Sequence, residues 1–466
     1  MAPIDDTTTA PAIGRLTGAP ALLDRFEQGR GRLPGAGTPW IDALRGGGLA
    51  AFRDRGIPNR KVEAWKYTDL RRLTKLGFAP APVVEGPLPD DLSARLAEAS
   101  GSGHDPLFVL VNGRFRGDLS RLSGLPKGLE IASLAEALTA GDDLLSSHLG
   151  QLINADDKPF AGLNTAMMAD GLVLRLKRDA VLERPLRLVS IAAPGAGDAA
   201  QVPVFFPRHL IVCGANSRAT VIETHLGPDG AAWLADSVTE VTVGEGARLN
   251  HYRRQADGTG AFNIGTALVR LSKDATYDGF ALATGADLSR YELSAALDGP
   301  GGDCRINGAY LGRHGQQIDN TTFIDHIAPD CRSRQVYKGV LDDQARGVFQ
   351  AKIGVRREAQ RTDGHQLNKA LLLSRGAEID SKPELEIFAD DVKCSHGATA
   401  GEIDKQALFY LRSRGIGEAD ARALLVEAFV RDAVEEIGDE TAREEFDAAI
   451  RAWLESHRAR IREAAA

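Results

Sequence analysis

Hydrophobic residues recur at two different spacings along the chain, and the change of spacing divides it into three zones. Between about 170 and 395, apolar and polar residues alternate in short runs such as 172–176, 238–243 and 267–271. A period of two is that of a β-strand with one buried face. Similar turn chemistry, rich in Gly, Asn and Asp, follows these runs at intervals of about 30 residues. The pattern predicts stacked strand–turn units, each burying its inward residues against the next.

The zones on either side have helical spacing. Apolar residues recur every three or four positions in 421–429, and also in 41–52, where three consecutive glycines at 46–48 are expected to break the helix. Two consecutive β-sandwiches are the alternative for the middle zone, but a β-helix accounts better for more than 200 residues of short strands. The fold class is therefore mainly β. The predicted domains are an N-terminal helical and mixed domain (1–165), a β-helix core (166–400) and a C-terminal helical domain (401–466).

Composition narrows the class of protein. The 466 residues carry a formal net charge of -8 without long basic runs, which argues against binding to nucleic acid or to an anionic membrane surface. No apolar run approaches the roughly 20 residues that span a bilayer, and the N-terminus lacks the pattern of an export signal. The four cysteines are far apart in sequence. A cytoplasmic protein without disulfides is expected.

Several enzyme motifs are missing from the sequence. It contains no GxxxxGK[ST] and no GxGxxG, so neither a P-loop for ATP nor the usual dinucleotide site is expected. GxSxG and HExxH are absent too. The chain therefore lacks the common motifs of a self-sufficient enzyme.

The strongest candidate for chemistry is a thiol and an imidazole two residues apart, Cys394 and His396. If this segment is a strand, both side chains point to the same face. A thiolate beside an imidazole suits iron, zinc or sulfur-transfer chemistry, but two ligands make only half of a closed site. The alternative is that Cys394 is a small buried side chain and His396 a hydrogen-bonded turn residue.

Five segments of the chain resemble the SufB/SufD family of the SUF iron–sulfur cluster assembly system. The first is 56–70, with the pattern G-I-P-x-x-K-x-E-x-W-K-Y-T-x-L. The others are 368–374, 382–387, 391–399 and 409–416. The E-x-W-x-Y-T pattern and the Cys-Ser-His-Gly form at 394–397 are similar to SufD rather than to SufB.

The resemblance implies a fold and a set of partners. It implies a right-handed parallel β-helix between helical domains, joined to SufB as a heterodimer through the β-helix ends. A SufC ATPase would dock on the C-terminal helices, tentatively at Phe409, Tyr410, Arg412 and Arg414. The chain itself would be a non-catalytic scaffold, and whether it forms a homodimer without SufB stays open.

The resemblance also assigns a cargo to the candidate site. His396 and Cys394 would contact iron or a transient iron–sulfur cluster at the SufB interface, with no cofactor held tightly by this chain alone. The other cysteines, Cys213, Cys304 and Cys331, are expected to be buried and structural, although Cys331 follows Pro-Asp and is expected at an exposed turn.

Two other functions remain open from the sequence. One is a SufB-like paralogue that accepts sulfur directly. The other is a β-helix carbohydrate-active enzyme, in which carboxylates such as Asp319, Asp325 and Asp330 would act as acid and base. Aromatic residues, which commonly form sugar platforms, make up only 6% of the chain.

Overall fold

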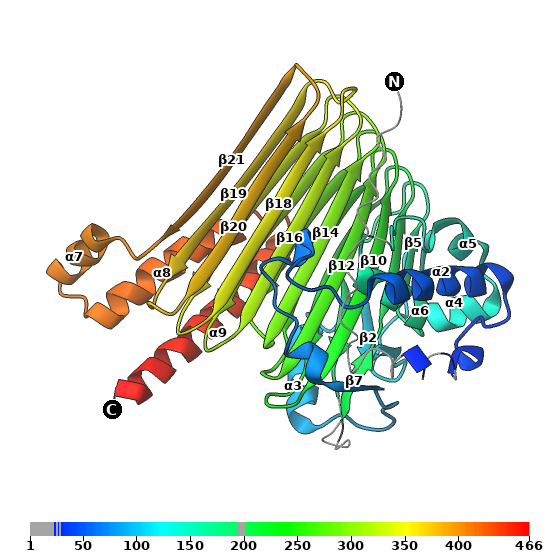
Figure 1. Ribbon diagram of the computed structural model, residues 1–466, viewed down its shortest axis with the longest axis horizontal. Helices are drawn as coiled ribbons and strands as arrows, with labels where there is room; N and C mark the ends of the chain where they lie inside the picture. The colour runs from blue at the N-terminus through cyan, green and yellow to red at the C-terminus, as the bar shows by residue number, and fades with distance from the viewer. Residues whose placement is uncertain are drawn as a thin grey trace.

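The computed structural model describes residues 23–465, except 25, 26, 28, 156, 194 and 196–200. In this part of the chain, two large sheets of 11 and 10 strands form a largely parallel solenoid (Figure 1). The chain alternates between the sheets, so each long strand pairs in register with the strand two further along; Arg332, for example, lies opposite Asp363. The predicted mainly β fold with a parallel β-helix core is confirmed.

The first sheet, called sheet A, ends at β20. Its strands are β1 (Gly77–Pro80), β4 (Leu129–Ser133), β5 (Leu172–Leu176), β7 (Gln201–Phe205), β8 (Arg208–Cys213), β10 (Trp233–Val243), β12 (Ala261–Leu271), β14 (Leu288–Leu297), β16 (Gln317–His326), β18 (Arg346–Val355) and β20 (Glu378–Ile387).

The second sheet, called sheet B, ends at β21. Its strands are β2 (Leu107–Val111), β3 (Arg114–Phe115), β6 (Leu186–Ile191), β9 (Arg218–Leu226), β11 (Arg248–Ala256), β13 (Thr276–Ala283), β15 (Asp303–Gly312), β17 (Arg332–Leu341), β19 (Thr362–Leu372) and β21 (Val392–Gly401).

Turns with a left-handed residue allow the chain to pass from one sheet to the other. Asn216, Asp274 and Asp330 have φ angles of 59°, 53° and 60°. Asn and Asp tolerate this conformation better than other non-glycine residues, because their short side chains hydrogen-bond to the local backbone. The repeated Gly, Asn and Asp positions of the sequence thus mark the corners of the solenoid.

The interior of the solenoid changes character along its length. Its first and middle turns contain a continuous apolar core that includes Leu174, Val241 and Leu271. Towards β21, buried amides enter the interior: Gln335 and Gln366 are 0% and 2% exposed. They are neighbours in register on β17 and β19. The last turns are therefore held partly by polar contacts inside the solenoid.

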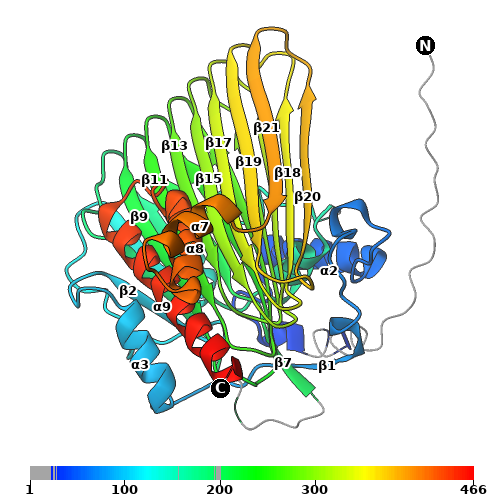
Figure 2. The same ribbon diagram turned by 90° about the vertical axis from the view of Figure 1, so that its left-hand side faces the viewer.

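The C-terminal helices cover the outer face of sheet B, as Figure 2 shows. Phe446 packs edge-to-face on Phe280, and the ammonium group of Lys338 donates to the carbonyl oxygen of Phe429 at 2.9 Å. These contacts anchor two of the three helices. The helices are α7 (Lys405–Ser413), α8 (Glu418–Val434) and α9 (Glu440–Ala465).

The N-terminal region lies over the outer face of sheet A and at the first turns. Its longer helices are α2 (Pro39–Arg55) and α6 (Pro159–Met167). The expected break at 46–48 is wrong, because α2 runs through all three glycines. A Cβ at Gly48 would lie 2.6 Å from the carbonyl oxygen of Gly162, so glycine here allows α2 and α6 to approach closely. The remaining helices are η1 (Arg30–Arg32), η2 (Glu63–Trp65), η3 (Leu73–Lys75), α3 (Asp90–Ala99), α4 (Leu134–Ala140) and α5 (Asp143–His148).

Residues 56–70, which we call the N-terminal strap, cross four strands of sheet A on its outer face. The guanidinium of Arg290 on β14 stacks on the Trp65 ring, with Cζ 3.8 Å from the ring centroid. Further along, Gln317 of β16 donates to Tyr67 O at 2.8 Å, and the strap reaches β20 through Glu63 and Lys382. The strap therefore connects the middle of the solenoid to its last turn.

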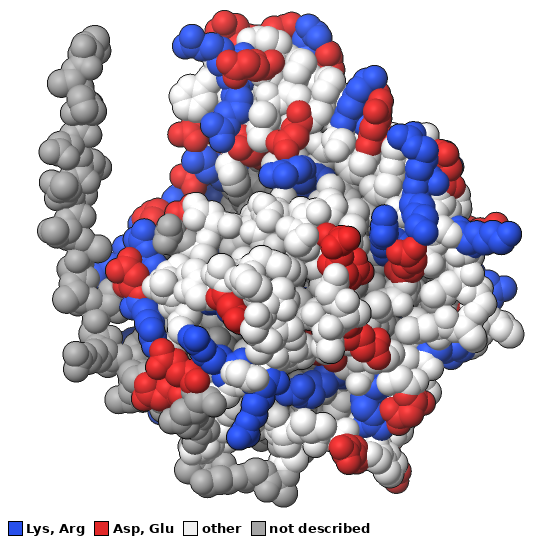
Figure 3. Space-filling model, turned by 90° about the vertical axis from the view of Figure 1, so that its right-hand side faces the viewer, with Lys and Arg blue, Asp and Glu red and all other residues white. Residues whose placement is uncertain are grey.

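Charged side chains of both signs are interspersed on the face viewed in Figure 3, where much of the surface is uncharged. This face lies at the end of the solenoid that carries α2, α4 and α5. No helix among residues described by the structure is long and apolar enough to cross a membrane.

Candidate functional site

Cys394 and His396 both lie on β21, which has no neighbour on its outer edge in the described chain. Cys394 lies opposite Gly364 and His396 opposite Gln366 on β19. A Cβ built on Gly364 would lie 3.6 Å from the Cys394 sulfur, so this thiol points to the interior. His396, two residues on in the same strand, lies on the same face, as predicted.

The surroundings of Cys394 suppress its thiolate. The side chain is half-buried and packs against a small apolar cluster that includes Ile353, Val355 and Ala389. Burial raises the pKa of the Cys394 thiol, and the nearby Asp363 carboxylate also raises it. A raised pKa keeps Cys394 protonated at neutral pH, and no cation among the described residues lowers this pKa as in a nucleophilic cysteine.

His396 is exposed and makes no hydrogen bond or ion pair with any described residue. Within that part of the chain, no three His, Cys, Asp or Glu side chains come together as a group able to hold a metal ion. Imidazole is a good ligand for iron, but one histidine and one protonated thiol leave most of a coordination sphere to be supplied. The pair has the composition of half a site.

The two open edges at this end of the solenoid differ. On β20, Pro383 has no N–H to donate, and the neighbouring Glu384 and Glu386 are exposed carboxylates. Proline and charge on an edge strand hinder pairing with another chain. On β21 the exposed Ala398 and Ala400 leave the backbone accessible. The geometry favours β21, the strand that carries His396, as the edge open to another strand.

Two polar neighbours of the pair were missed by reasoning from sequence. On the outer face, His365 Nδ1 lies 2.6 Å from Ser395 Oγ and its Nε2 lies 2.7 Å from Asp363. On the inner face, Gln366 lies beneath His396. The repeat of about 30 residues brings 365 and 366 near 395 and 396 to within a residue or two, and the strand register then pairs them.

Beyond the C-terminal end of β21, α7 carries three of the residues expected to dock SufC, and the fourth, Arg414, caps the C-terminus of this helix. Phe409 and Tyr410 are 73% and 57% exposed, unusual values for large apolar side chains. Arg414 lies over the Tyr410 ring at 5.2 Å, and Arg412 pairs with Glu418 at 3.2 Å. Because His396 lies in the first half of β21, the structure keeps these residues apart from it.

The other three cysteines are buried, as expected. Burial raises the pKa of Cys213 to about 12 and that of Cys304 further. The expectation that Cys331 lies at an exposed turn is wrong in one respect. It follows the left-handed Asp330, but its side chain is 0% exposed and its thiol faces the carbonyl oxygen of Gly299 at 3.4 Å.

The carboxylates considered for glycoside hydrolysis are engaged in ion pairs. Asp325 pairs with Arg356 at 2.8 Å. Asp330 pairs with Arg361 at 2.5 Å, and Asp319 is fully buried against Arg290. An arginine thus neutralises each of the three carboxylates, which does not favour their use as a free acid and base pair.

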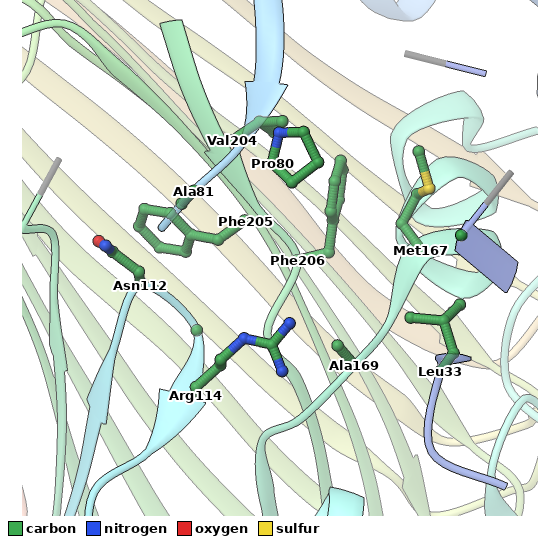
Figure 4. A pocket seen from close by; sticks show the side chains of 12 residues that line it. Leu33, Pro80, Ala81, Asn112, Arg114, Met167, Ala169, Val204, Phe205 and Phe206 are labelled. Atoms are coloured by element: carbon green, nitrogen blue, oxygen red, sulfur yellow. The ribbon is translucent and has the colours of Figure 1, made fainter. Parts of the chain in front are cut away.

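A cavity of about 150 Å³ lies at the first turns, far along the solenoid from His396 (Figure 4). The Arg114 side chain points into it beside Phe206. None of the lining residues is a cysteine, a histidine or a carboxylate. The cavity therefore offers no strong ligand for iron. Its walls are Gly29, Leu33, Pro80, Ala81, Asn112, Gly113, Arg114, Met167, Ala169, Val204, Phe205 and Phe206.

The structure is thus a parallel solenoid whose bare edge strand carries a Cys/His pair with only part of a coordination sphere. Two family models match the chain: the SufBD protein N-terminal region over residues 19–188, and the SufBD core domain of the SUF system for FeS cluster assembly over residues 196–429. The chain belongs to the SufBD family of iron–sulfur cluster assembly proteins, which confirms the resemblance noted from sequence.

Curated relatives match over most of their length. An iron–sulfur cluster assembly SufBD family protein of Synechocystis is 31% identical over 392 residues, covering 82% of this chain and 84% of the relative. The iron–sulfur cluster assembly protein SufD of Escherichia coli is 31% identical over 391 residues, covering 84% and 88%. A SufBD family protein of Mycobacterium tuberculosis is 32% identical over 408 residues, covering 86% and 90%.

Proposed function

We propose that this chain is a SufD-like scaffold subunit that contributes one half of a cluster assembly site to an interface with SufB. The observation that carries the proposal is the position of His396 and Cys394 on the bare edge strand at the open end of the solenoid. A second solenoid joined there would bring its own thiolate or carboxylate ligands to His396. The chain itself would catalyse no reaction.

Separate roles for this chain and its proposed partners account for two missing features, a P-loop and a complete coordination sphere. The P-loop is missing because ATP would be bound by a separate SufC subunit, docked at the exposed Phe409 and Tyr410 of α7. The coordination sphere is incomplete because a partner would complete it. His396, exposed and unbonded among the described residues, would be the ligand that iron or a nascent cluster contacts. Cys394 would lie beside this cargo as a secondary ligand.

The test is native mass spectrometry and cluster formation on this chain co-expressed with SufB and SufC from its own organism. Wild type and His396→Ala are expected to assemble equally, because His396 is exposed and makes no hydrogen bond or ion pair within the described residues. The variant is expected to lose most cluster formation. His365→Ala is the matched control: it removes a histidine from the adjacent strand on the outer face, and cluster formation is expected to persist.

A different outcome would overturn the proposal. If the chain assembles with neither partner, the scaffold role fails. If His396→Ala forms clusters at the wild-type rate, the ligand role fails while the scaffold role stands.

The alternative of a SufB-like protein that accepts sulfur directly requires a reactive thiol on the isolated chain. Because burial raises the Cys394 pKa, alkylation by iodoacetamide at pH 7.5 is expected to be slower than for a free cysteine and to accelerate towards pH 9.5. Peptide mass spectrometry would measure the rate at each cysteine, with buried Cys304 as the unreactive reference. Alkylation of Cys394 faster than free cysteine at pH 7.5 would favour direct sulfur acceptance.

A further inference from the structure

The side chain beneath His396 has one hydrogen-bonding atom without a partner. Gln366 lies opposite His396 in the β19–β21 register and is only 2% exposed. Its Nε2 donates to the carbonyl oxygen of Glu384 at 2.8 Å, which fixes which end of the amide is nitrogen. Its Oε1 is buried and accepts no hydrogen bond within the described chain. A buried acceptor left in this state costs about 1–3 kcal/mol.

Only two side chains adjoin Gln366 along this column of the interior, Gln335 below it and His396 above it. Gln335 accepts a hydrogen bond from Thr322 at 2.5 Å, and its own Nε2 also lacks a partner. A carbonyl oxygen has two lone pairs. If Nε2 of Gln335 donates to Oε1 of Gln366, this hydrogen bond occupies one lone pair of that oxygen. The other lone pair remains for a donor at the open end, where His396 is the next side chain.

We propose that Gln366 is a positioning residue for His396, and that its Oε1 accepts a hydrogen bond from one N–H of the imidazole ring. This inference rests on the proposed role of His396 as a ligand. The bond would fix one tautomer of the ring and turn its other nitrogen, which carries the lone pair, away from the interior. Histidines that bind metals commonly donate their second ring nitrogen to an acceptor in this way.

The bond can form without breaking another contact. His396 is exposed and makes no hydrogen bond within the described residues, so a new bond to its ring replaces none there. The amide of Gln366 is already held by Glu384 from the opposite sheet. A ring anchored on a rigid amide loses less freedom when it binds iron than a ring that rotates in solvent.

The test is the tautomeric state of the ring in the full chain, labelled with ¹⁵N-histidine and observed by ¹H–¹⁵N correlation spectroscopy. Wild-type His396 is expected to show one tautomer, whereas the exposed His104 shows the solution mixture. Gln366→Leu is expected to give His396 the mixture of His104, and Gln366→Glu, which keeps an acceptor, to restore one tautomer. Gln335→Leu is the matched control, one rung deeper in the same column, and is expected to behave as wild type.

Several results would overturn the inference. One is a mixture of tautomers at His396 in the wild type, which needs no variant to detect. Another is a single tautomer that survives Gln366→Leu. A third is an equal effect of Gln335→Leu, which would indicate general repacking of the interior.

The assembled complex separates this inference from the proposed function. With SufB and SufC present, Gln366→Leu is expected to slow cluster formation by about 10- to 100-fold. Wild-type cluster formation in His396→Ala would overturn the proposed function. Loss of cluster formation in His396→Ala, together with an unchanged rate in Gln366→Leu, would overturn only the role of Gln366.

Discussion

Replacement of Arg290 by methionine is expected to lower the free energy of unfolding by about 3–5 kcal/mol, because it leaves the buried Asp319 carboxylate without its cation. The Arg290 side chain is fully buried and forms ion pairs with Glu292 and Asp319. It also donates to the carbonyl oxygen of Ala64 at 2.8 Å and stacks on Trp65. One guanidinium therefore joins β14 and β16 to the N-terminal strap.

Trypsin cleavage of the strap would measure the effect of Arg290→Met more sensitively than global unfolding. The strap contains the trypsin sites Arg60, Lys61 and Lys66. A loss of about 3 kcal/mol raises the population of the released state roughly 100-fold, and cleavage follows that population when opening is fast. The matched control is Arg305→Met on β15, whose pair with Asp303 is partly exposed to solvent. This control is expected to lower the free energy of unfolding by less than about 1 kcal/mol.

The Arg290 variant also has an expected pH dependence. Burial raises the pKa of Asp319 even with Arg290 beside it, and loss of the guanidinium raises this pKa further. A carboxyl group with a raised pKa in the folded protein destabilises the fold increasingly as pH rises towards that pKa. The deficit of the variant, measured by urea denaturation, is therefore expected to be larger at pH 8 than at pH 5. Equal unfolding midpoints and equal trypsin rates for Arg290→Met and wild type would contradict the assigned role.

Replacement of Ala398 by proline is expected to weaken association through the open edge by about 100-fold and leave the fold intact. Asp363 N–H donates back to the carbonyl oxygen of Cys331, and Lys393 stands opposite Asp363. In a parallel ladder, a residue whose N–H points away from the neighbouring strand stands opposite one whose N–H points towards it, so the N–H of Lys393 points to β19. The direction alternates from residue to residue, and Ala398, five residues further on, therefore points its N–H to the open edge. Proline at 398 removes an edge donor without breaking the β19–β21 ladder.

Loss of this donor leaves a partner carbonyl unpaired, and the proline ring obstructs close approach; together about 3 kcal/mol corresponds to the expected 100-fold. Sedimentation velocity with co-purified SufB measures the association, and circular dichroism checks the fold. Ala398→Ser, which keeps the donor, is expected to associate as wild type. Undiminished association of the proline variant would mean that β21 is not the pairing edge.

Local patterns predicted much of this molecule. The alternation of apolar and polar residues between 170 and 395 was enough to predict that this region forms β-strands. It also placed Cys394 and His396 on one face of a strand. The repeat of about 30 residues sufficed for the stacking of strands, because each turn of the solenoid contacts only its neighbours. Fold and site were predictable to this extent because the relevant spacings lie within one or two turns of the solenoid.

Contacts between distant segments were not predictable. The partner of Trp65 is Arg290, and nothing near either residue indicates the other. The glycines at 46–48 predict a helix break, because the local pattern does not show the close approach of Gly162, far along the chain. Gln366 could be placed beside His396 only from the exact strand register, which sequence periodicity gives to within a residue or two.

The N-terminal strap has a consequence for synthesis of the chain on the ribosome. Its last contact joins Glu63 to Lys382, 319 residues further along. At roughly 5–20 residues per second, Glu63 waits about 15 to 60 seconds for this partner to be made. For the first part of that interval, until β14 and its Arg290 are made, Trp65 has no strand to cover. The newborn chain thus passes through a period in which an aromatic segment is exposed to chaperones, and the strap is complete only when the last turn of the solenoid leaves the ribosome.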